Sequence, residues 1–253
     1  MTDEAAQIRQ EFQQEKLPNQ QILLQDTPYQ TSAFIFKAEQ PGTNIMLIGG
    51  THGNEPAGYE AGLRLLQRFT KNPPKSGTII LIPLANRMAV DNFERRVPVP
   101  DGVDIEKGNL NRCYPGKAAG YPMEQLSYAI EQLVRENRVS LFIDMHEAMR
   151  NHLDTEYEGV QKGLGQTLIY SPNDATTFYL IDLLDAINEK ITNPSEKFSA
   201  LERPVKYSGA WWAGKYLDIA AFTFETSRSL PLATRINLHL FLVDQALKTA
   251  GVY

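Results

Sequence analysis

Cysteine and long apolar runs are scarce in this chain of 253 residues. Cys113 is the only cysteine, so no disulfide can form within the chain, as is usual in a reducing compartment. No apolar run approaches the roughly 20 residues that a membrane-spanning helix needs, and residues 1–7 are acidic and polar, unlike a secretory signal. We therefore predict a cytoplasmic protein without a membrane partner.

Positive charge is scarce as well. Lys and Arg number 25 against 30 Asp and Glu, the net charge is −5, and Arg95 and Arg96 form a pair rather than a longer basic run. Nucleic-acid-binding domains usually carry a basic face, so we expect no nucleic-acid partner. The 42% apolar and 22% charged residues are typical of a folded globular protein, and the length suits one large domain.

Apolar runs alternate with amphipathic stretches along the chain. Residues 44–48, 78–83 and 140–145 are runs expected of strands that are buried on both faces. Further strands are expected at residues 21–24, 32–37, 166–171 and 220–224, and helices at residues 3–16, 56–68, 124–137, 176–190 and 232–249. This alternation predicts a single α/β domain with a mostly parallel or mixed sheet. Residues 84–123 form a loop long enough to be functional.

Four groups capable of chemistry follow the predicted buried strands. His52 and Glu55 come shortly after residue 48, His146 follows residue 145, and Glu225 follows Phe224. Ligands of open α/β sheets bind beyond the C-terminal ends of the strands, so we expect these four side chains to meet there.

A zinc site fits three of these groups. His52, Glu55 and His146 form a two-histidine, one-carboxylate set, which is common around zinc and leaves one position for water. The glycines that flank His52 let the backbone turn sharply toward one ion. The alternative for the His52–Glu55 spacing alone is an ordinary surface pair.

Glu225 is the candidate general base. A charged carboxylate after a buried aromatic strand is costly unless something compensates it. Beside zinc, which makes bound water more acidic, a carboxylate can take the water proton and pass it to a leaving nitrogen. The alternative is an ion pair with a nearby arginine such as Arg228.

The long loop supplies positive charge. Asn111 and Arg112 follow a turn and could hold a substrate carboxylate, because a guanidinium matches two carboxylate oxygens. Another arginine near the metal could polarise the scissile carbonyl. Arg95 and Arg96 are the candidates, and their spacing does not choose between them.

Four motifs, in order, resemble the zinc carboxypeptidase superfamily and, within it, the succinylglutamate desuccinylase/aspartoacylase group. They are Gly-Thr-His-Gly-Asn-Glu at residues 50–55, Asn-Leu-Asn-Arg-Cys-Tyr-Pro-Gly at 109–116, Ile-Asp-Met-His at 143–146 and Phe-Glu at 224–225. The resemblance spans about residues 44–250 and implies helices flanking an eight-stranded mixed sheet.

The same resemblance implies a role for each candidate residue. One zinc per chain would be held by His52, Glu55 and His146, with Glu225 as the base. It also implies that Asn111 and Arg112 bind the substrate carboxylate, and that Arg95 or Arg96 polarises the carbonyl.

The chain also departs from the family pattern. Asn109 stands where the motif usually begins with Asp, a position that we expect to support the loop more than the chemistry. The residues after Glu225 suffice for one helix, so we expect no C-terminal β-rich extension and a more open site. Such a site keeps a metallocarboxypeptidase or a peptidoglycan-peptide amidase as an alternative, with Tyr207 as a residue that caps the substrate.

We therefore predict one zinc-hydrolase domain over residues 1–253. Residues 1–40 would form an N-terminal helix and edge strands, and residues 41–253 the catalytic core. The predicted activity is cleavage of the amide bond of an N-acyl amino acid, or of a similar small or short-peptide substrate with a free carboxylate. A second alternative is a non-catalytic binding protein on the same fold. Neither the oligomeric state nor the identity of the acyl group follows from the sequence.

Overall fold

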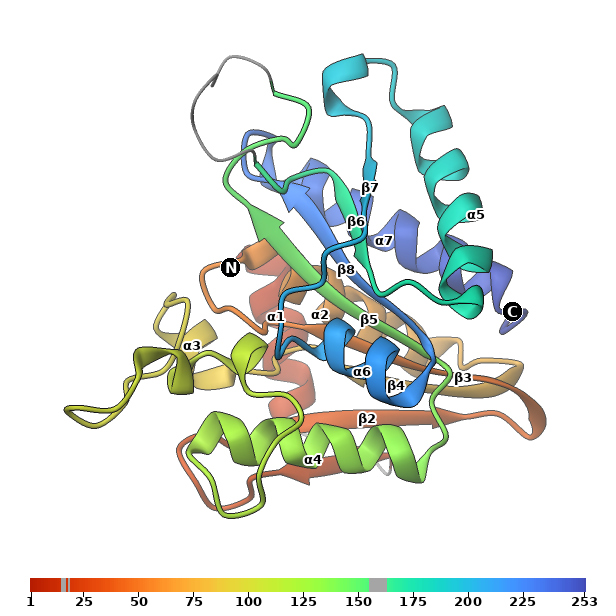
Figure 1. Cartoon of the computed structure of the whole chain (residues 1–253). Coiled ribbons are helices and arrows are strands. Elements are labelled where there is room, and N and C mark those ends of the chain that lie inside the picture. Colours follow the sequence, from red (N-terminus) through yellow and green to blue (C-terminus); the bar gives the residue numbers. More distant parts are fainter. Residues whose placement is uncertain (15–16, 18, 155–162) are drawn as a thin grey trace.

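The buried apolar runs form the centre of an eight-stranded mixed sheet in the computed structural model, which describes residues 1–14, 17, 19–154 and 163–253 (Figure 1). Across the sheet the strand order is β1-β2-β4-β3-β5-β8-β6-β7. The strands are β1 (Gln20–Leu23), β2 (Thr31–Lys37), β3 (Gln40–Gly49), β4 (Ser76–Ile82), β5 (Leu141–Ala148), β6 (Thr167–Tyr170), β7 (Ser199–Leu201) and β8 (Ala220–Ser227). The predicted fold class is confirmed.

The centre of the sheet is parallel. Strands β4, β3, β5 and β8 run in one direction, whereas β1 with β2, β2 with β4, and β6 with β8 are antiparallel pairs. Strands β5 and β8 stay paired as far as Ala148 and Ser227, several residues past their predicted ends. As a result they extend beyond the end of β3 at Gly49. The short strand β7 was not predicted.

Helices cover both faces of the sheet (Figure 1). They are α1 (Asp3–Gln14), α2 (Pro56–Lys71), α3 (Arg87–Asp91), α4 (Pro122–Glu136), α5 (Asp174–Lys190), α6 (Gly209–Leu217) and α7 (Leu232–Thr249). In β3, Ile45 and Leu47 belong to an apolar cluster that includes residues of α2, α5 and α7, while Met46 and Ile48 belong to one that includes residues of α4 and α6. This alternation follows from the two-residue period of a strand and gives two apolar cores, one on each face.

Two of these helices were not predicted, and the predicted end of a third lies outside the described residues. Helices α3 and α6 were not predicted, because α3 lies within the long loop and α6 opens with glycine and two tryptophans. Helix α1 was predicted to continue to residue 16 and to stop at Pro18, but residues 15, 16 and 18 lie outside the described residues. Within the described ranges no helix is both long and apolar enough to cross a membrane.

A sharp turn after β3 carries the first site residues to the sheet edge. Gly50 adopts a φ of +72°, which reverses the chain direction at little steric cost. Gly53 lies so close to the loop that a Cβ atom there would be 2.0 Å from the backbone of Ala89. Pro56 then begins α2, in the first turn of a helix, where the N–H that proline lacks would have no partner within the helix.

The loop between β4 and α4 is fastened to the α4/α6 face of the sheet. Tyr114 is buried and stacks on Trp212 of α6, with ring centroids 5.9 Å apart and planes 26° apart. Its ring also meets Phe142 of β5 edge-on at 6.4 Å. These aromatic contacts hold the loop against α6 and the beginning of β5.

Candidate metal centre

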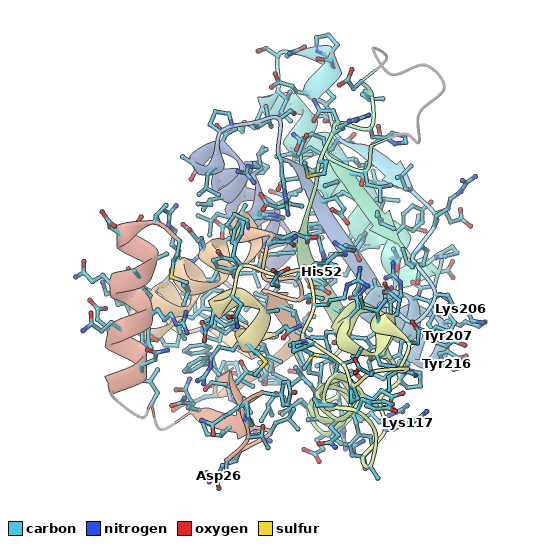
Figure 2. The ribbon with its side chains drawn as sticks, turned by 90° about the vertical axis from the view of Figure 1, so that its left-hand side faces the viewer. Asp26, His52, Lys117, Lys206, Tyr207 and Tyr216 are labelled. Carbon is cyan, nitrogen blue, oxygen red and sulfur yellow. The ribbon has the colours of Figure 1, made fainter. Side chains whose placement is uncertain are left out.

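His52, Glu55 and His146 converge at the C-terminal edge of the sheet (Figure 2 labels His52 in the middle of the molecule). Their candidate ligand atoms lie within 4.8 Å of one another, and all three side chains are buried. Glu55 places Oε1 2.8 Å from Nδ1 of His52 and Oε2 2.8 Å from Nδ1 of His146. The two Nδ1 atoms are 3.2 Å apart. The structure thus brings together the three residues that were predicted as zinc ligands.

The other nitrogen of each imidazole lies close to an oxygen atom, in hydrogen-bond contact for His52 and at ion-pair distance for His146. Nε2 of His52 lies 3.0 Å from Oδ1 of Asn109. Nε2 of His146 lies 2.9 Å from Oδ2 of Asp144, a carboxylate that also accepts a hydrogen bond from the hydroxyl of Thr51 at 2.9 Å. Because amide and carboxylate oxygens accept, these contacts favour a proton on each Nε2 and leave both Nδ1 lone pairs facing Glu55.

This donor arrangement fits a cation. Two imidazole lone pairs and a carboxylate repel one another unless a proton or a metal ion lies between them. Burial lowers the pKa of His146, but Asp144 and Glu55 outweigh it and raise the pKa well above its ordinary value. Burial raises the pKa of Glu55, yet His52 and His146 hold it well below its ordinary value. The buried set of His52, Glu55 and His146 could therefore bind a metal ion, and two imidazole nitrogens with one carboxylate suit zinc.

Glu225 lies next to the ligand set on the neighbouring strand. In the parallel pairing of β5 and β8 it stands opposite His146. Its Oε2 is buried without a hydrogen-bond partner among the described residues. Burial raises the pKa of Glu225 to about 8, although His146 opposes this. The alternative of an ion pair with Arg228 is not seen, because Arg228 donates to the backbone carbonyl of Asn54.

A cavity of about 370 Å³ opens beside these residues. Its polar lining contains four buried side-chain oxygens without hydrogen-bond partners in the described part of the chain, from Asn54, Asn111, Glu147 and Glu225. Arg112 is half-buried in the wall and donates to the backbone oxygen of Asn111 at 2.7 Å. Apolar residues complete the lining: Ala148, Met149, Leu164, Ile169 and Val205. Unpaired buried polar atoms in a concave, partly apolar wall are typical of a ligand-binding site.

The structure separates Arg95 from Arg96. Nη1 of Arg95 donates to Oε1 of Glu55 at 2.9 Å, and Arg95 lines the cavity. Arg96 instead donates to Glu106 at 2.7 Å and does not line the cavity. Arg95 is therefore the arginine that reaches the candidate metal centre, although its role in polarising a carbonyl stays a prediction.

Tyr207 lies outside the cavity that contains Glu225. The residue is 44% exposed, and its ring meets that of Trp211 edge-on with centroids 5.3 Å apart. It lines a neighbouring pocket of about 330 Å³, which shares Arg112 with the cavity. Figure 2 shows Tyr207 beside Lys206 at the periphery, far to one side of His52. A substrate-capping role for Tyr207 stays a prediction.

Three contacts at the site were not predicted. Asp144 and Thr51 support His146, and Asn109, which was expected mainly to support the loop, contacts His52 directly. Asp144 could have been found, because residues two apart in a strand share a face with each other. Asn109 could not, because 57 residues separate it from His52 and only the folded loop joins them.

The succinylglutamate desuccinylase/aspartoacylase catalytic-domain family matches residues 41–161, which confirms the predicted resemblance. The N-alpha-acetyl-L-2,4-diaminobutyric acid deacetylase of Halomonas elongata is 34% identical over 110 residues, which are 43% of this chain and 30% of the deacetylase. The family and this relative carry the names of hydrolases.

Solved structures share the fold. The mDAP-bound form of Csd4 from Helicobacter pylori, described as a D,L-carboxypeptidase, aligns with a TM-score of 0.73 and 16% identity over 87% of this chain and 55% of its own. A succinylglutamate desuccinylase/aspartoacylase from Rhodobacter sphaeroides aligns with a TM-score of 0.63 and 17% identity over 92% of this chain and 64% of its own. The chain thus spans less than a third of the curated relative and little more than half of Csd4.

Proposed function

Because residues 41–161 match the succinylglutamate desuccinylase/aspartoacylase catalytic-domain family, we propose that the protein is a zinc-dependent deacylase. It cleaves the amide bond of an N-acyl amino acid, or of a similar small substrate that carries a free carboxylate. We also propose that the protein is cytoplasmic and that residues 41–253 form its catalytic core.

The pairing of the ligand set with an unpartnered carboxylate carries this proposal. His52, Glu55 and His146 would hold the ion, which supplies Lewis-acid polarisation of a carbonyl and makes a nearby water more acidic. Glu225 stands opposite His146 in the strand pairing and has a buried oxygen without a partner among the described residues. A metal-binding site with a structural role would not need such a group.

Each remaining residue has a specific role in the proposed reaction. Glu225, the buried carboxylate opposite His146 in the strand pairing, accepts the proton of the attacking water and passes it to the leaving nitrogen. Arg95 donates to the carbonyl oxygen as negative charge develops there. Asn111 and Arg112 hold the substrate carboxylate at the cavity wall.

A substrate panel tests the proposal. The purified protein, with its metal content measured, is offered N-acetyl and N-succinyl amino acids, and release of the free amine is followed. We expect turnover that is lost with a chelator, restored by zinc, and absent from E225Q. Bound zinc without turnover of any substrate would indicate a binding protein on this fold instead.

A metallocarboxypeptidase is the second candidate. Arg112 lines both the cavity and the neighbouring pocket of about 330 Å³. With a substrate carboxylate held by Arg112, the neighbouring pocket leaves room for a further side chain of a peptide. The Csd4 structure described as a D,L-carboxypeptidase has the same fold. Peptides with a free C-terminus, included in the same panel, separate the two activities by the bond that is cut.

A further inference from the structure

The two histidines of the candidate metal centre have different supports. His146 lies beside the carboxylate of Asp144, which is on the same strand and is held by Thr51. His52 faces a neutral amide, that of Asn109, which comes from the long loop. A carboxylate partner makes a ligating imidazole more basic than an amide does. The two ligands are therefore supported unequally.

Every polar atom of the Asn109 side chain is used. Oδ1 faces Nε2 of His52 at 3.0 Å and accepts a hydrogen bond from the backbone of Asn111 at 3.1 Å. Nδ2 donates to Oε2 of Glu106 at 2.7 Å. The residue is 1% exposed, so water does not substitute for these partners. An amide can accept on one side and donate to a carboxylate on the other, whereas an ionised carboxylate can only accept.

Glu106 is itself held by the arginines of the loop. Its Oε1 accepts from Nη1 of Arg96 at 2.7 Å, and Nε of Arg112 lies 3.9 Å from its Oε2. A carboxylate at position 109 would face Glu106 at the distance of the present 2.7 Å hydrogen bond, and the two like charges would repel. The side-chain contacts from Glu106 to Asn109 and from Asn109 to His52 thus connect the side of the cavity proposed to bind a carboxylate to a proposed metal ligand.

We propose that Asn109 is a positioning residue for His52, and that Glu106 is the reason why this position carries an amide rather than a carboxylate. The proposal rests on the proposed function only in that His52 binds the ion. Asn109 fixes the ring so that Nδ1 points to the metal, and Glu106 fixes the amide. Breaking either contact loosens one of three ligands.

Metal binding without substrate tests the proposal. Zinc affinity is measured by competition with a chromophoric chelator, and the absorption spectrum of the cobalt-loaded protein reports the ligand geometry. The variants are N109A, E106Q, N109D and the double variant E106Q/N109D. We expect N109A to weaken zinc binding about 10- to 100-fold and to change the cobalt spectrum. We expect N109D to bind zinc more weakly than the wild type, and E106Q/N109D to bind at least about tenfold more tightly than N109D, because the second carboxylate has been removed.

A matched control separates positioning from a general loss of structure. Asn188 is another amide with two backbone partners, the nitrogen and the oxygen of Phe198 at 2.7 and 3.0 Å, and it does not line the cavity. N188A should leave zinc affinity unchanged. Thermal unfolding of each metal-free variant checks that it is folded, and if N109A does not fold, the N109D and E106Q/N109D pair, which keeps the side-chain shape, decides the result.

Two outcomes would overturn the proposal. Zinc affinity of a folded N109A within about twofold of the wild type would remove Asn109 as a positioning residue. Equal affinities of N109D and E106Q/N109D would remove Glu106 as the reason for the amide. The expected order of affinities in a protein that hydrolyses no substrate would instead sink the proposed function and leave this proposal standing.

Discussion

The candidate site has two halves that are built in different ways. One half lies on the strands: Asp144 and His146 are on β5, and Glu225 is on β8. The other half lies on the loop between β4 and α4 and contributes Arg95 and Arg112. The strand half is positioned by a continuous ladder of backbone hydrogen bonds, whereas the loop half depends on aromatic packing and on ion pairs between side chains.

This difference suggests a division of labour. His146 and the candidate base Glu225, which must keep a constant distance to each other, are on paired strands, where neighbouring backbones are about 4.8 Å apart. The other two candidate ligands, His52 and Glu55, lie in the sharp turn between β3 and α2. Groups that choose the substrate are on the loop, where sequence can change at lower structural cost. We therefore expect substitutions in the strand half to affect the rate of the chemical step, and substitutions in the loop half to affect substrate binding and charge stabilisation.

Removing the base should have the largest effect. E225Q keeps the shape of the side chain but cannot accept a proton, so we expect kcat to fall about 10³-fold while zinc stays bound. The measurement is steady-state hydrolysis of the best substrate of the panel, with zinc content as the control. Activity above one tenth of the wild-type value would show that another group is the base.

Replacing Arg95 by alanine should have the next largest effect, with the same replacement of the neighbouring Arg96 as the comparison. Arg95 contacts Glu55, whereas Arg96 contacts Glu106 away from the cavity. We expect R95A to lower kcat/KM about 10²-fold, because an oxyanion donor is lost, and R96A to lower it by no more than about threefold, which is typical of a partly exposed ion pair. Equal losses in both variants would contradict the assignment of Arg95.

Replacing Arg112 by lysine should raise KM rather than lower kcat. Lysine keeps the charge but loses the two parallel hydrogen bonds to a carboxylate, so we expect an increase of about 10- to 50-fold. The same substrate with its carboxylate converted to a carboxamide serves as the comparison. For that substrate the wild type and R112K should differ little, and a persisting difference would mean that Arg112 does not hold the carboxylate.

The pH dependence of stability should show the buried carboxylate of the strand half. In the metal-free protein the pKa of Glu225 is raised from 4.5 to about 8, so folding favours its protonated form. The contribution of protonated Glu225 to the free energy of unfolding is fully present at pH values below its ordinary pKa of 4.5, and it is lost as the pH rises toward 8. We expect the free energy of unfolding to fall more steeply in the wild type than in E225Q, by about 1.4 kcal/mol per pH unit, over this window.

Urea unfolding of both proteins in the presence of a chelator, at intervals from pH 5 to pH 8, gives the two slopes. Parallel slopes would show that Glu225 is already ionised in the folded metal-free protein.

The strand half of the site could be predicted from the sequence because its signals are local. Apolar runs that end in a polar group predicted the position of His146 and Glu225, and the turn chemistry around Gly50 predicted that His52 and Glu55 share one edge. Most of the sheet followed in the same way. Only β7, with three residues, was too short to produce a hydrophobic period.

The loop half could not be predicted in the same detail, because its contacts join residues that are distant in the chain. The choice between Arg95 and Arg96 depends on which side chain faces Glu55, 40 positions earlier in the sequence. Asn109 is an ordinary loop residue until the fold places it against His52. Such contacts are set by packing of the whole loop on α6 and not by any period or motif.

The extension of β5 and β8 beyond β3 has a consequence for hydrogen exchange. Amides in a paired interior strand exchange only when the domain unfolds, whereas loop amides exchange through local opening. The backbone around His146 and Glu225 therefore belongs to the slowly exchanging core, while that around Asn109 and Arg112 can open separately. At moderate urea concentrations the protein should release a bound carboxylate ligand before the strands that carry His146 and Glu225 separate.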